Sequence, residues 1–534
     1  MFRHPGVYIK ELPAKNPPIT AAPTSITAFV GHLKRGVRVT GVAGKPVFIR
    51  SVAQYAKKFG PPAGDHGGIA NRGAKVDPFG HAINAFFANG GSKAYVVPVA
   101  RTPGKSATCK VEIRELIKKK VDLGRTVLFE ATSSGKWADN LLVKLKQETT
   151  GTFTLIIGTQ DPASLAQTQT SRKRHDAVLE TFSGLTMAAG GSTSITKKVN
   201  RRSTLVRVKV DATIPAAAGT PTEAQAEMAG GVDTRAPLAT DYTIALKRLE
   251  DYRDIATLLL PGKDWTNSRT EYESAIAHAE LMKNRMVIID PQNPRTYATR
   301  LITQRNVTAA GFPTSPYTAL YYPYLKVTNP YYDAKSAPGL PKTFALGPAA
   351  AVAGVWARID GARGVWKAPA GLEATLRGTL GPTLPVSNTL QRTLNPLGVN
   401  CLRPIKGPTV IWGARTLASR THPEYRYVAV RRVRNMIAQS LYHALQQRVF
   451  EPNDQNLWSS LRDSVTEFMN GLYRAGAFQG NKSTDAYYVR CGVGQTMTQA
   501  DSNAGIVRVE VGFAPLKPAE FVVLNVEYTV GQSR

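Results

Sequence analysis

The chain has 534 residues, which is too many for one compact core, so we expect two to four domains. Hydrophobic residues make up 43% of the sequence and charged residues 20%, and this composition excludes global disorder. The net charge of +30 is spread along the chain, which favours attraction to acidic surfaces of either nucleic acid or protein.

Cysteine usage and hydropathy indicate the compartment in which the chain is made. The three cysteines, Cys109, Cys401 and Cys491, lie far apart and form no CxxC pair, so we expect reduced thiols, with an intersubunit disulfide as the alternative. The longest mostly apolar stretch, residues 344–357, is too short to span a bilayer, and the N-terminus shows no secretory signal. We therefore expect a soluble chain made in a cytoplasm.

The N-terminal region predicts an extended arm followed by an α/β domain. Val7, Tyr8 and Ile9 belong to a short strand, and the four prolines that follow it up to residue 23 favour extended chain. Further strands and helices are then expected in alternation, with strands at 26–31, 46–49 and 94–99 and helices at 52–59 and 81–88. This alternation is typical of α/β domains.

Residues 101–236 differ from the rest in character. They contain short β-like runs at 141–146, 153–157 and 205–210, separated by segments rich in threonine, serine and glycine. Residues 216–231 read as loop. We interpret this region as an inserted β-rich domain.

The α/β pattern returns near residue 249 and leads into the clearest helix of the chain. An apolar run at 255–260, a helix at 272–283 and a buried strand at 286–291 are expected. Residues 425–449 then repeat apolar positions at spacings of three and four, with Arg431, Arg432 and Arg434 on the other faces. We expect this basic cluster to face an acidic partner, with solvent exposure or pairing inside the subunit as the alternative.

The C-terminal part predicts a second helix and two strands. The helix carries apolar residues from Leu457 to Leu472, and the strands lie at 506–513 and 521–528. Phe521, Val523 and Val526 belong to the last strand. Strands therefore lie close to both ends of the sequence, where they can add to the sheet edge of another chain.

These patterns predict a multidomain fold of the α/β (α+β) class. It combines discontinuous α/β core domains with an inserted β-rich domain and extended terminal strand arms. The expected divisions are an arm at 1–30, a central α/β domain at 31–100 plus 237–372, the inserted domain at 101–236 and a C-terminal domain at 373–534.

Motifs for catalysis or cofactor binding are incomplete. Residues 101–106 resemble a phosphate-binding loop, but Val99 stands where the motif requires glycine. The sequence has no HExxH motif and no GxSxG motif, and His278 is interpreted as a packing or hydrogen-bonding residue of a helix. We expect no enzyme activity, no catalytic residues, no cofactor and no metal site.

Several blocks in order along the chain resemble the tail sheath family of contractile phages and related particles. The strongest is AGVWARID at 353–360, followed by RGVWKAPA at 363–370. The others are PGVYI at 5–9, TSITAFVG at 24–31, FFANGGSKAYVV at 86–97, AHAE at 277–280, SPYTALYYPYL at 315–325, LNPLGVN at 394–400 and VIWGARTL at 410–417. The turn GKWADN at 135–140 departs from the family's Gly-x-Trp-Gly-Asn pattern, and residues 101–236 are the region least covered.

The resemblance implies a structural subunit that forms stacked hexameric rings around a tail tube and contracts to drive the tube through the host envelope. It implies that subunits exchange terminal strands and that the C-terminal third faces the tube, so Arg431, Arg432 and Arg434 become candidate tube contacts. The implied partners are other copies of the chain, the tube protein, and the baseplate and terminator proteins, without direct nucleic acid or stable membrane insertion. The implied location is a virion tail assembled in the host cytoplasm.

Two alternatives remain open at this point. The same subunit chemistry serves a phage-tail-like bacteriocin or a contractile injection system, which lacks a capsid. From a different class, the +30 charge also suits a basic nucleic-acid-binding protein. Residues 101–236 are expected to face outward and to be dispensable for polymerisation.

Overall fold

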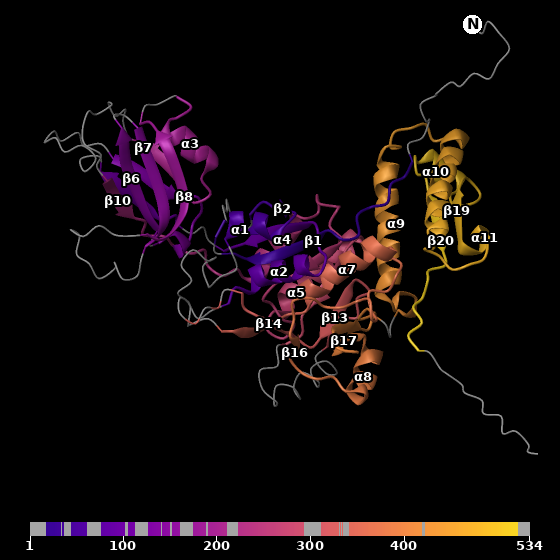
Figure 1. Cartoon of the computed structure of the whole chain (residues 1–534). Helices are drawn as coiled ribbons and strands as arrows, with labels where there is room; N and C mark the ends of the chain where they lie inside the picture. Colours follow the sequence, from indigo (N-terminus) through magenta and orange to yellow (C-terminus); the bar gives the residue numbers. More distant parts are fainter. Residues whose placement is uncertain are drawn as a thin grey trace, which may run out of the picture.

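A computed structural model describes residues 18–33, 35–36, 44–60, 76–101, 105–112, 126–139, 141–149, 152–160, 175–187, 191–210, 223–292, 311–330, 332, 334, 341–418 and 422–521. Figure 1 shows a central α/β unit, with a β-rich unit on one side and a C-terminal unit on the opposite side. The expected mixed α/β multidomain class is confirmed.

The central unit is built on an eight-stranded sheet with the order β18-β17-β13-β12-β11-β1-β3-β2. The inner pairs are parallel, and the two outermost pairs are antiparallel. Parallel strands are buried on both faces, which explains their continuous apolar sequences. The strands are β1 (Thr27–His32), β2 (Val47–Ile49), β3 (Ala94–Val99), β11 (Thr257–Leu259), β12 (Met286–Ile289), β13 (Thr318–Tyr322), β17 (Val399–Pro404) and β18 (Thr409–Trp412).

Helices cover both faces of this sheet because successive strand residues point to opposite sides. Phe29 packs on the face covered by α1 (Val52–Phe59), α2 (Pro78–Ala88) and α7 (Ala349–Arg363). Its neighbour Val30 packs on the face covered by α4 (Ala239–Lys247), α5 (Arg269–Met282) and α8 (Asn388–Leu394). A small sheet of β14 (Leu325–Thr328), β15 (Thr343–Leu346) and β16 (Gly381–Pro382) lies beside them.

Two of the predicted divisions differ from the observed units. β17 and β18 lie beyond residue 373, yet they extend the central sheet by pairing with β13. β1 crosses the limit of the predicted arm at residue 30 and forms the middle of the same sheet. The predicted boundaries at 30 and 372 were therefore wrong, because pairing between strands far apart in sequence decides which unit a strand joins.

The β-rich unit has two sheets around its own core. One sheet contains β4 (Thr108–Glu112), β5 (Thr126–Ala131) and β9 (Val206–Val210), and the other contains β6 (Leu141–Thr149), β7 (Thr152–Gln160), β8 (His175–Leu185) and β10 (Glu223–Glu227). Phe129, Leu155 and Val208 pack in this core together with α3 (Ile195–Arg202). β10 falls in the predicted loop at 216–231, because pairing with β6 imposes a strand on a sequence of low β propensity.

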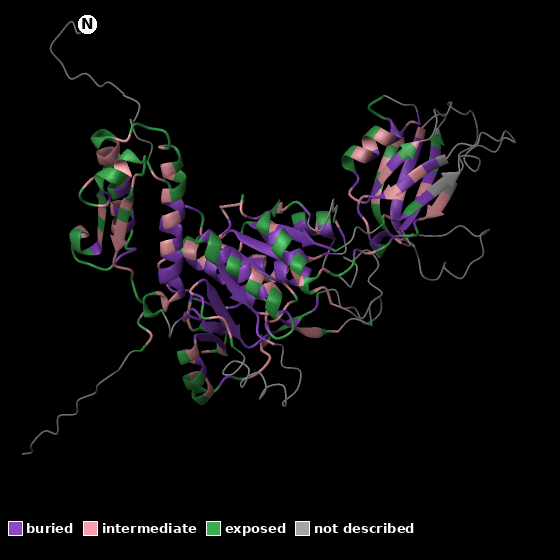
Figure 2. Ribbon diagram, turned by 180° about the vertical axis from the view of Figure 1, so that it is seen from behind, coloured by how far each residue is buried: buried purple, intermediate pink, exposed green. Residues whose placement is uncertain are grey.

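The C-terminal unit packs helices against a two-stranded sheet. Its elements are α9 (Val428–Gln446), α10 (Gln455–Arg474), α11 (Ser483–Ala486), β19 (Tyr487–Cys491), α12 (Gln499–Asn503) and β20 (Val509–Phe513). Ile437, Val465 and Phe478 belong to its core. The first three turns of α9 are largely buried and its last turns are exposed, as the colours of Figure 2 show.

Asp290, just after β12, is a buried carboxyl at the start of α7. Its Oδ1 accepts a hydrogen bond of 2.8 Å from the backbone N–H of Ala349, and a Cβ at Gly347 would collide with its Oδ2. Burial raises the pKa of Asp290 to about 7, the hydrogen bond from Ala349 opposes this, and the charge of Asp264 adds to it. In the folded chain the carboxyl therefore stays protonated up to about pH 7.

We predict that Asp290 makes stability fall as the pH rises towards neutrality. Because its folded pKa of about 7 exceeds the ordinary value of 3.8, its contribution is complete below pH 3.8 and is lost as the pH rises through 7. Asp290→Asn cannot ionise, so the melting temperature of this variant should change less than that of the wild type between these pH values. Asp251→Asn, at an exposed position, is the control, and equal pH slopes in wild type and Asp290→Asn would contradict the prediction.

Candidate interaction site at the bases of the terminal segments

The segment that precedes β1 is fixed to the C-terminal unit before it enters the central sheet. The backbone N–H of Ala22 donates a buried hydrogen bond of 2.8 Å to Oγ of Ser440 in α9. Ile19 packs against the core of the C-terminal unit. The described N-terminal segment therefore runs along α9. Ile19 lies towards the C-terminal end of the helix, and Thr24 lies nearer its start.

A buried ion pair fastens this segment at Thr24. The guanidinium group of Arg432 in α9 donates from Nη1 to Oδ1 of Asp360 in α7 over 2.9 Å, and its Nη2 contacts Oδ2 of the same carboxylate. Thr24 donates from Oγ1 to Asp360 over 2.6 Å and accepts from Arg432 at its carbonyl oxygen over 3.1 Å. The arginine and aspartate side chains are 4% and 6% exposed. The three residues therefore form one closed hydrogen-bonded group.

Aromatic rings complete the surroundings of the basic residues of α9. The guanidinium of Arg432 lies 4.6 Å from the ring centre of Trp356, whose indole N–H donates to the hydroxyl of Tyr321. Arg431 lies between Tyr317 and Tyr425, at 3.8 and 4.2 Å from their ring centres. Burial lowers the pKa of Arg431 from its usual value. Stacking on aromatic faces is a typical role of arginine in a protein interior.

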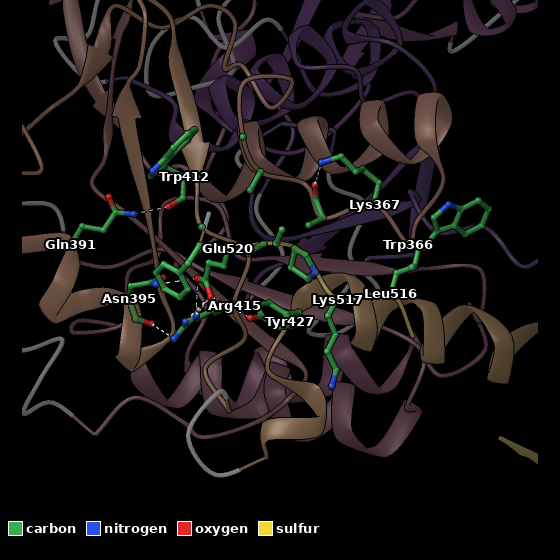
Figure 3. Close-up of a pocket in the computed structure, with 18 of the residues that line it drawn as sticks. Trp366, Lys367, Gln391, Asn395, Trp412, Arg415, Tyr427, Leu516, Lys517 and Glu520 are labelled. Atoms are coloured by element: carbon green, nitrogen blue, oxygen red, sulfur yellow. Dashed lines mark hydrogen bonds and ion pairs between the residues drawn. The ribbon is translucent and has the colours of Figure 1, made fainter. Parts of the chain in front are cut away.

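The C-terminal segment is fixed at Glu520, beside the start of α9. Arg415 binds the Glu520 carboxylate from Nε and Nη2, with the shortest contact at 2.6 Å, as Figure 3 shows. Asn395 donates to the same carboxylate over 3.0 Å, and the hydroxyl of Tyr427 donates over 3.3 Å. A bidentate arginine with two further donors defines both the position and the orientation of a carboxylate.

The electrostatics of Glu520 agree with this role. Partial burial raises the pKa of Glu520, but the hydrogen bonds from Arg415 and Asn395 and the charge of Arg415 lower it more, and the net pKa lies below its usual value. The carboxylate is therefore charged at neutral pH, and the bonds that hold the segment are intact.

The two anchors lie at different positions along the same helix. Tyr427, which binds Glu520, immediately precedes α9, whereas Ser440, which binds Ala22, lies in its second half. At a rise of about 1.5 Å per residue, the 13 positions between these two residues span about 20 Å. The N-terminal segment is therefore held along α9 from Arg432 to Ser440, whereas the C-terminal segment is held at the start of the helix.

Two of the predicted contact residues, Arg431 and Arg432, are buried and not at a surface as expected. Arg431 and Arg432 are 3% and 4% exposed and have partners within the subunit, so they are not available to a tube. This corrects the expectation for both and agrees with the alternative of internal pairing, while partly buried Arg434 stays a candidate. Phe521 is 73% exposed, and the remaining arm residues fall outside the described residues: Val7, Tyr8, Ile9, Val523 and Val526.

Sequence reasoning missed the acidic partners of both anchors. Asp360 stands in the resembling block at 353–360 without an assigned role, and Glu520 belongs to no block. The signal available for Asp360 was a single acidic residue in a helix that is apolar apart from two arginines, because a carboxylate in such a helix needs a partner. No comparable signal existed for Glu520, because its partners Arg415 and Asn395 are more than a hundred residues away.

Other candidate chemistry is inert in the described part of the chain. No group of three or more His, Cys, Asp or Glu side chains there is arranged to hold a metal ion, and no described helix is long and apolar enough to cross a membrane. His278 is buried and accepts a hydrogen bond from Arg285, and burial followed by the charge of Arg285 lowers its pKa to about 3. All three cysteines are buried, and burial raises the pKa of Cys109 and Cys401 to about 12.

Two family models match the chain next to each other. Residues 236–417 match the phage tail sheath protein central domain, and residues 420–529 match the phage tail sheath C-terminal domain. Together these matches cover more than half of the sequence. No curated protein sequence matches the chain.

Solved structures share the fold over almost the whole chain. The anti-feeding prophage baseplate structure contains a chain with 22% identity and a TM-score of 0.58, covering 99% of this chain and 100% of that one. A chain in the contracted sheath complex of the PVC extracellular contractile injection system has 21% sequence identity and a TM-score of 0.54, and the match covers 99% of both chains. The sheath tail protein of Desulfitobacterium hafniense has 14% sequence identity and a TM-score of 0.56, and the match covers 91% of this chain and 93% of that one.

The multidomain α/β fold is that of contractile sheath proteins. The chain belongs to the phage tail sheath family, and the resemblance seen in the sequence is confirmed.

We predict that the ion pair of Arg432 and Asp360 behaves as one unit. Asp360→Ala leaves a buried, unpaired guanidinium and should lower the free energy of unfolding by about 3–5 kcal/mol. Replacing both residues by apolar ones of similar size, Asp360→Leu with Arg432→Met, should cost clearly less. Urea denaturation measures the difference. The prediction is contradicted if the loss of unfolding free energy in the double variant equals the sum of the losses in Asp360→Leu and Arg432→Met alone.

We also predict that Glu520 holds the C-terminal segment at neutral pH. Glu520→Gln should speed hydrogen exchange of residues 514–521 about tenfold or more, since it loses charge-assisted hydrogen bonds. The folded pKa lies below the ordinary 4.5, so anchoring is complete above pH 4.5 and is lost as the pH falls through the lower folded value. Glu510→Gln, in β20 and away from the anchor, is the control; similar protection in all three chains would refute the role of Glu520.

Proposed function

We propose that this chain forms stacked hexameric rings around a tail tube and contracts to drive the tube through a host envelope. The observation that carries this proposal is that both terminal segments are anchored at α9, the N-terminal one at Arg432 and Ser440 and the C-terminal one beside Tyr427. The Arg432–Asp360–Thr24 group and the Arg415–Glu520 group bind the bases of both terminal segments, and in this proposal force passes through them. A subunit that must rotate within a polymer without detaching requires connections of this kind.

The sheet of β19 and β20 supplies a place for the arms of neighbouring subunits. Within the described residues this sheet has only these two strands, so each strand leaves an outer edge unpaired. Unpaired edges accept further strands through backbone hydrogen bonds. Val7, Tyr8 and Ile9 of one neighbour and Val523 and Val526 of another are the candidate added strands.

The arrangement of the units supports an orientation in the sheath. The inserted and C-terminal units lie on opposite sides of the central unit, as Figures 1 and 2 show. With the C-terminal unit towards the tube, the inserted unit faces outward, and Arg434 is the basic residue of α9 proposed to meet acidic groups of the tube. Baseplate and terminator proteins are the proposed partners at the sheath ends, and assembly in the host cytoplasm is proposed.

Contraction in this proposal needs neither catalysis nor a cofactor. The work comes from a metastable assembled state whose subunits repack into an arrangement that buries more surface. Modest gains in each subunit add over the polymer. The chain therefore acts as a structural protein and not as an enzyme.

A sheath of a particle without a capsid is the second candidate. One structural relative belongs to the PVC extracellular contractile injection system by its title, and a phage sheath would share its mechanics. A capsid gene beside the coding sequence favours the phage. A nucleic-acid-binding role predicts salt-dependent retention of the monomer on DNA.

Deletion of residues 1–17 tests the arms and keeps the anchor intact. Ile19, Ala22 and Thr24 remain, so the truncated chain should fold with an unchanged melting temperature. It should form no sheath tubes, because the candidate N-terminal strand is absent. Electron microscopy of the purified chain measures tube formation. Normal tubes from the truncated chain would exclude a connecting role for these residues.

A further inference from the structure

The turn between α9 and α10 presents an aromatic side chain fully to solvent. Phe450 is 102% exposed, and its backbone φ of 74° lies in the left-handed region. Large non-glycine residues rarely adopt this conformation, and it persists only where the surrounding structure imposes it. Val449 beside it is 60% exposed. An exposed apolar tip in a strained conformation indicates a contact made outside the subunit.

Hydrogen bonds hold this tip in one conformation. Asn453 donates to the carbonyl oxygen of Ser502 over 3.0 Å and accepts from the indole N–H of Trp458 over 2.7 Å. Asp454 accepts from the backbone N–H of Leu457 and caps α10. The segment that follows Phe450 is therefore fixed at Asn453 and Asp454, which limits the freedom of the tip and lowers the entropic cost of binding.

The tip also carries negative charge. Glu451 directly follows Phe450, and Asp454 lies three residues further on; both are exposed. No lysine or arginine is ion-paired with either carboxylate in the described part of the chain. In a chain of net charge +30, this tip is a local acidic and aromatic feature.

A cavity of about 1210 Å³ lies beside the other end of α9, between β18, α8 and the segment from Leu516 to Phe521. Trp366 and Trp412 line it, as Figure 3 shows. Glu520 is its one acidic lining residue, against six basic ones: Arg363, Lys367, Arg392, Arg403, Arg415 and Lys517.

Several of these cations have no acidic partner. Arg415 is paired with Glu520 and Arg363 with Glu373, but the described residues contain no ion pair for Arg392 or Lys517. Arg403 donates from Nη1 to Gln391, and its buried Nε has no hydrogen-bond partner in that same part of the chain. The cavity therefore favours an occupant with acidic groups, and its tryptophans favour an aromatic ring.

We propose that Phe450 of one subunit, with Glu451 and Asp454 beside it, enters the cavity of a second copy of this chain. This inference rests on the proposed function as a self-assembling sheath and names a surface for it. The tip follows the end of α9, and Tyr427, at its beginning, lines the cavity. The 19 residues of α9 separate the two surfaces by about 28 Å. Complementary surfaces at opposite ends produce head-to-tail association, which closes into rings or continues as a helix.

The Phe450→Asn variant tests the aromatic ring without straining the subunit. Asparagine tolerates the left-handed conformation, so the melting temperature of the monomer should be unchanged or higher. Polymer formation should require about tenfold or more protein, because the buried ring is lost. Leu281→Asn, which changes an apolar side chain of α5 that is 66% exposed, is the matched control and should assemble normally.

Charge reversal and cross-linking test the partner. Glu451→Arg and Arg392→Glu should each weaken assembly, and the double variant should restore it if the residues meet. A mixture of Phe450→Cys and Trp412→Cys chains should give a disulfide-linked dimer on oxidation, since the native cysteines are buried. Neither single variant alone should give this dimer.

The outcomes separate this inference from the proposed function. If the wild type and Phe450→Asn polymerise equally and the cysteine mixture gives no dimer, the inference is wrong while the sheath function stands. A tip that contacts the tube, or a cavity filled by the chain's own C-terminal residues, gives this same result. If the wild type forms no polymer, the proposed function fails, and the presence or absence of the cross-linked dimer still decides the inference.

Discussion

The buried ion pair between Arg432 and Asp360 connects the parts of this structure that are furthest apart in sequence. It joins α9 to α7 and holds Thr24 just before β1, so it connects the C-terminal unit, the central unit and the N-terminal segment at one point. A charge buried this deeply is costly without its partner, and therefore alternative packings of α9 that separate the pair are strongly disfavoured. This constraint fixes the position of α9, and the second anchor, the cavity and the exposed tip are all placed relative to that helix.

The position of α9 separates the points at which the two terminal segments leave the C-terminal unit. Glu520 is held beside the start of the helix and Ala22 beside its second half, so forces on the two terminal segments enter a stiff element at separate points. A helix transmits such forces along its axis with little deformation, because each turn is closed by hydrogen bonds. The unit is therefore suited to rotate as a rigid body while its connections remain in place.

The distribution of charge follows the same arrangement. The chain carries a net charge of +30. In the sequence, Arg431 and Arg432 were the best candidates for a binding surface, but both are buried and paired inside the subunit. Six basic side chains line the cavity beside β18, and an acidic tip lies at the other end of α9. Copies of a strongly basic protein repel one another, and complementary local charges offset this repulsion where the copies meet.

Elements with continuous or periodic apolar patterns could be predicted from the sequence. β3 was predicted at its observed bounds, and the helices around residues 425–449 and 457–472 were found within three residues of their ends, because burial of each element leaves a pattern in nearby residues. The same patterns, together with blocks such as AGVWARID, determined the fold class and the family.

Only the tertiary structure decided which charged residues act inside the subunit and which remain available. Arg432 and Asp360 are separated by 72 positions and Thr24 and Asp360 by 336, so no local pattern connects them. The membership of β17 and β18 in the central sheet was decided in the same way, by pairing with β13. An amphipathic pattern reports whether a position favours burial, but a basic residue on a helix is buried or exposed according to whether a distant carboxylate or aromatic ring reaches it.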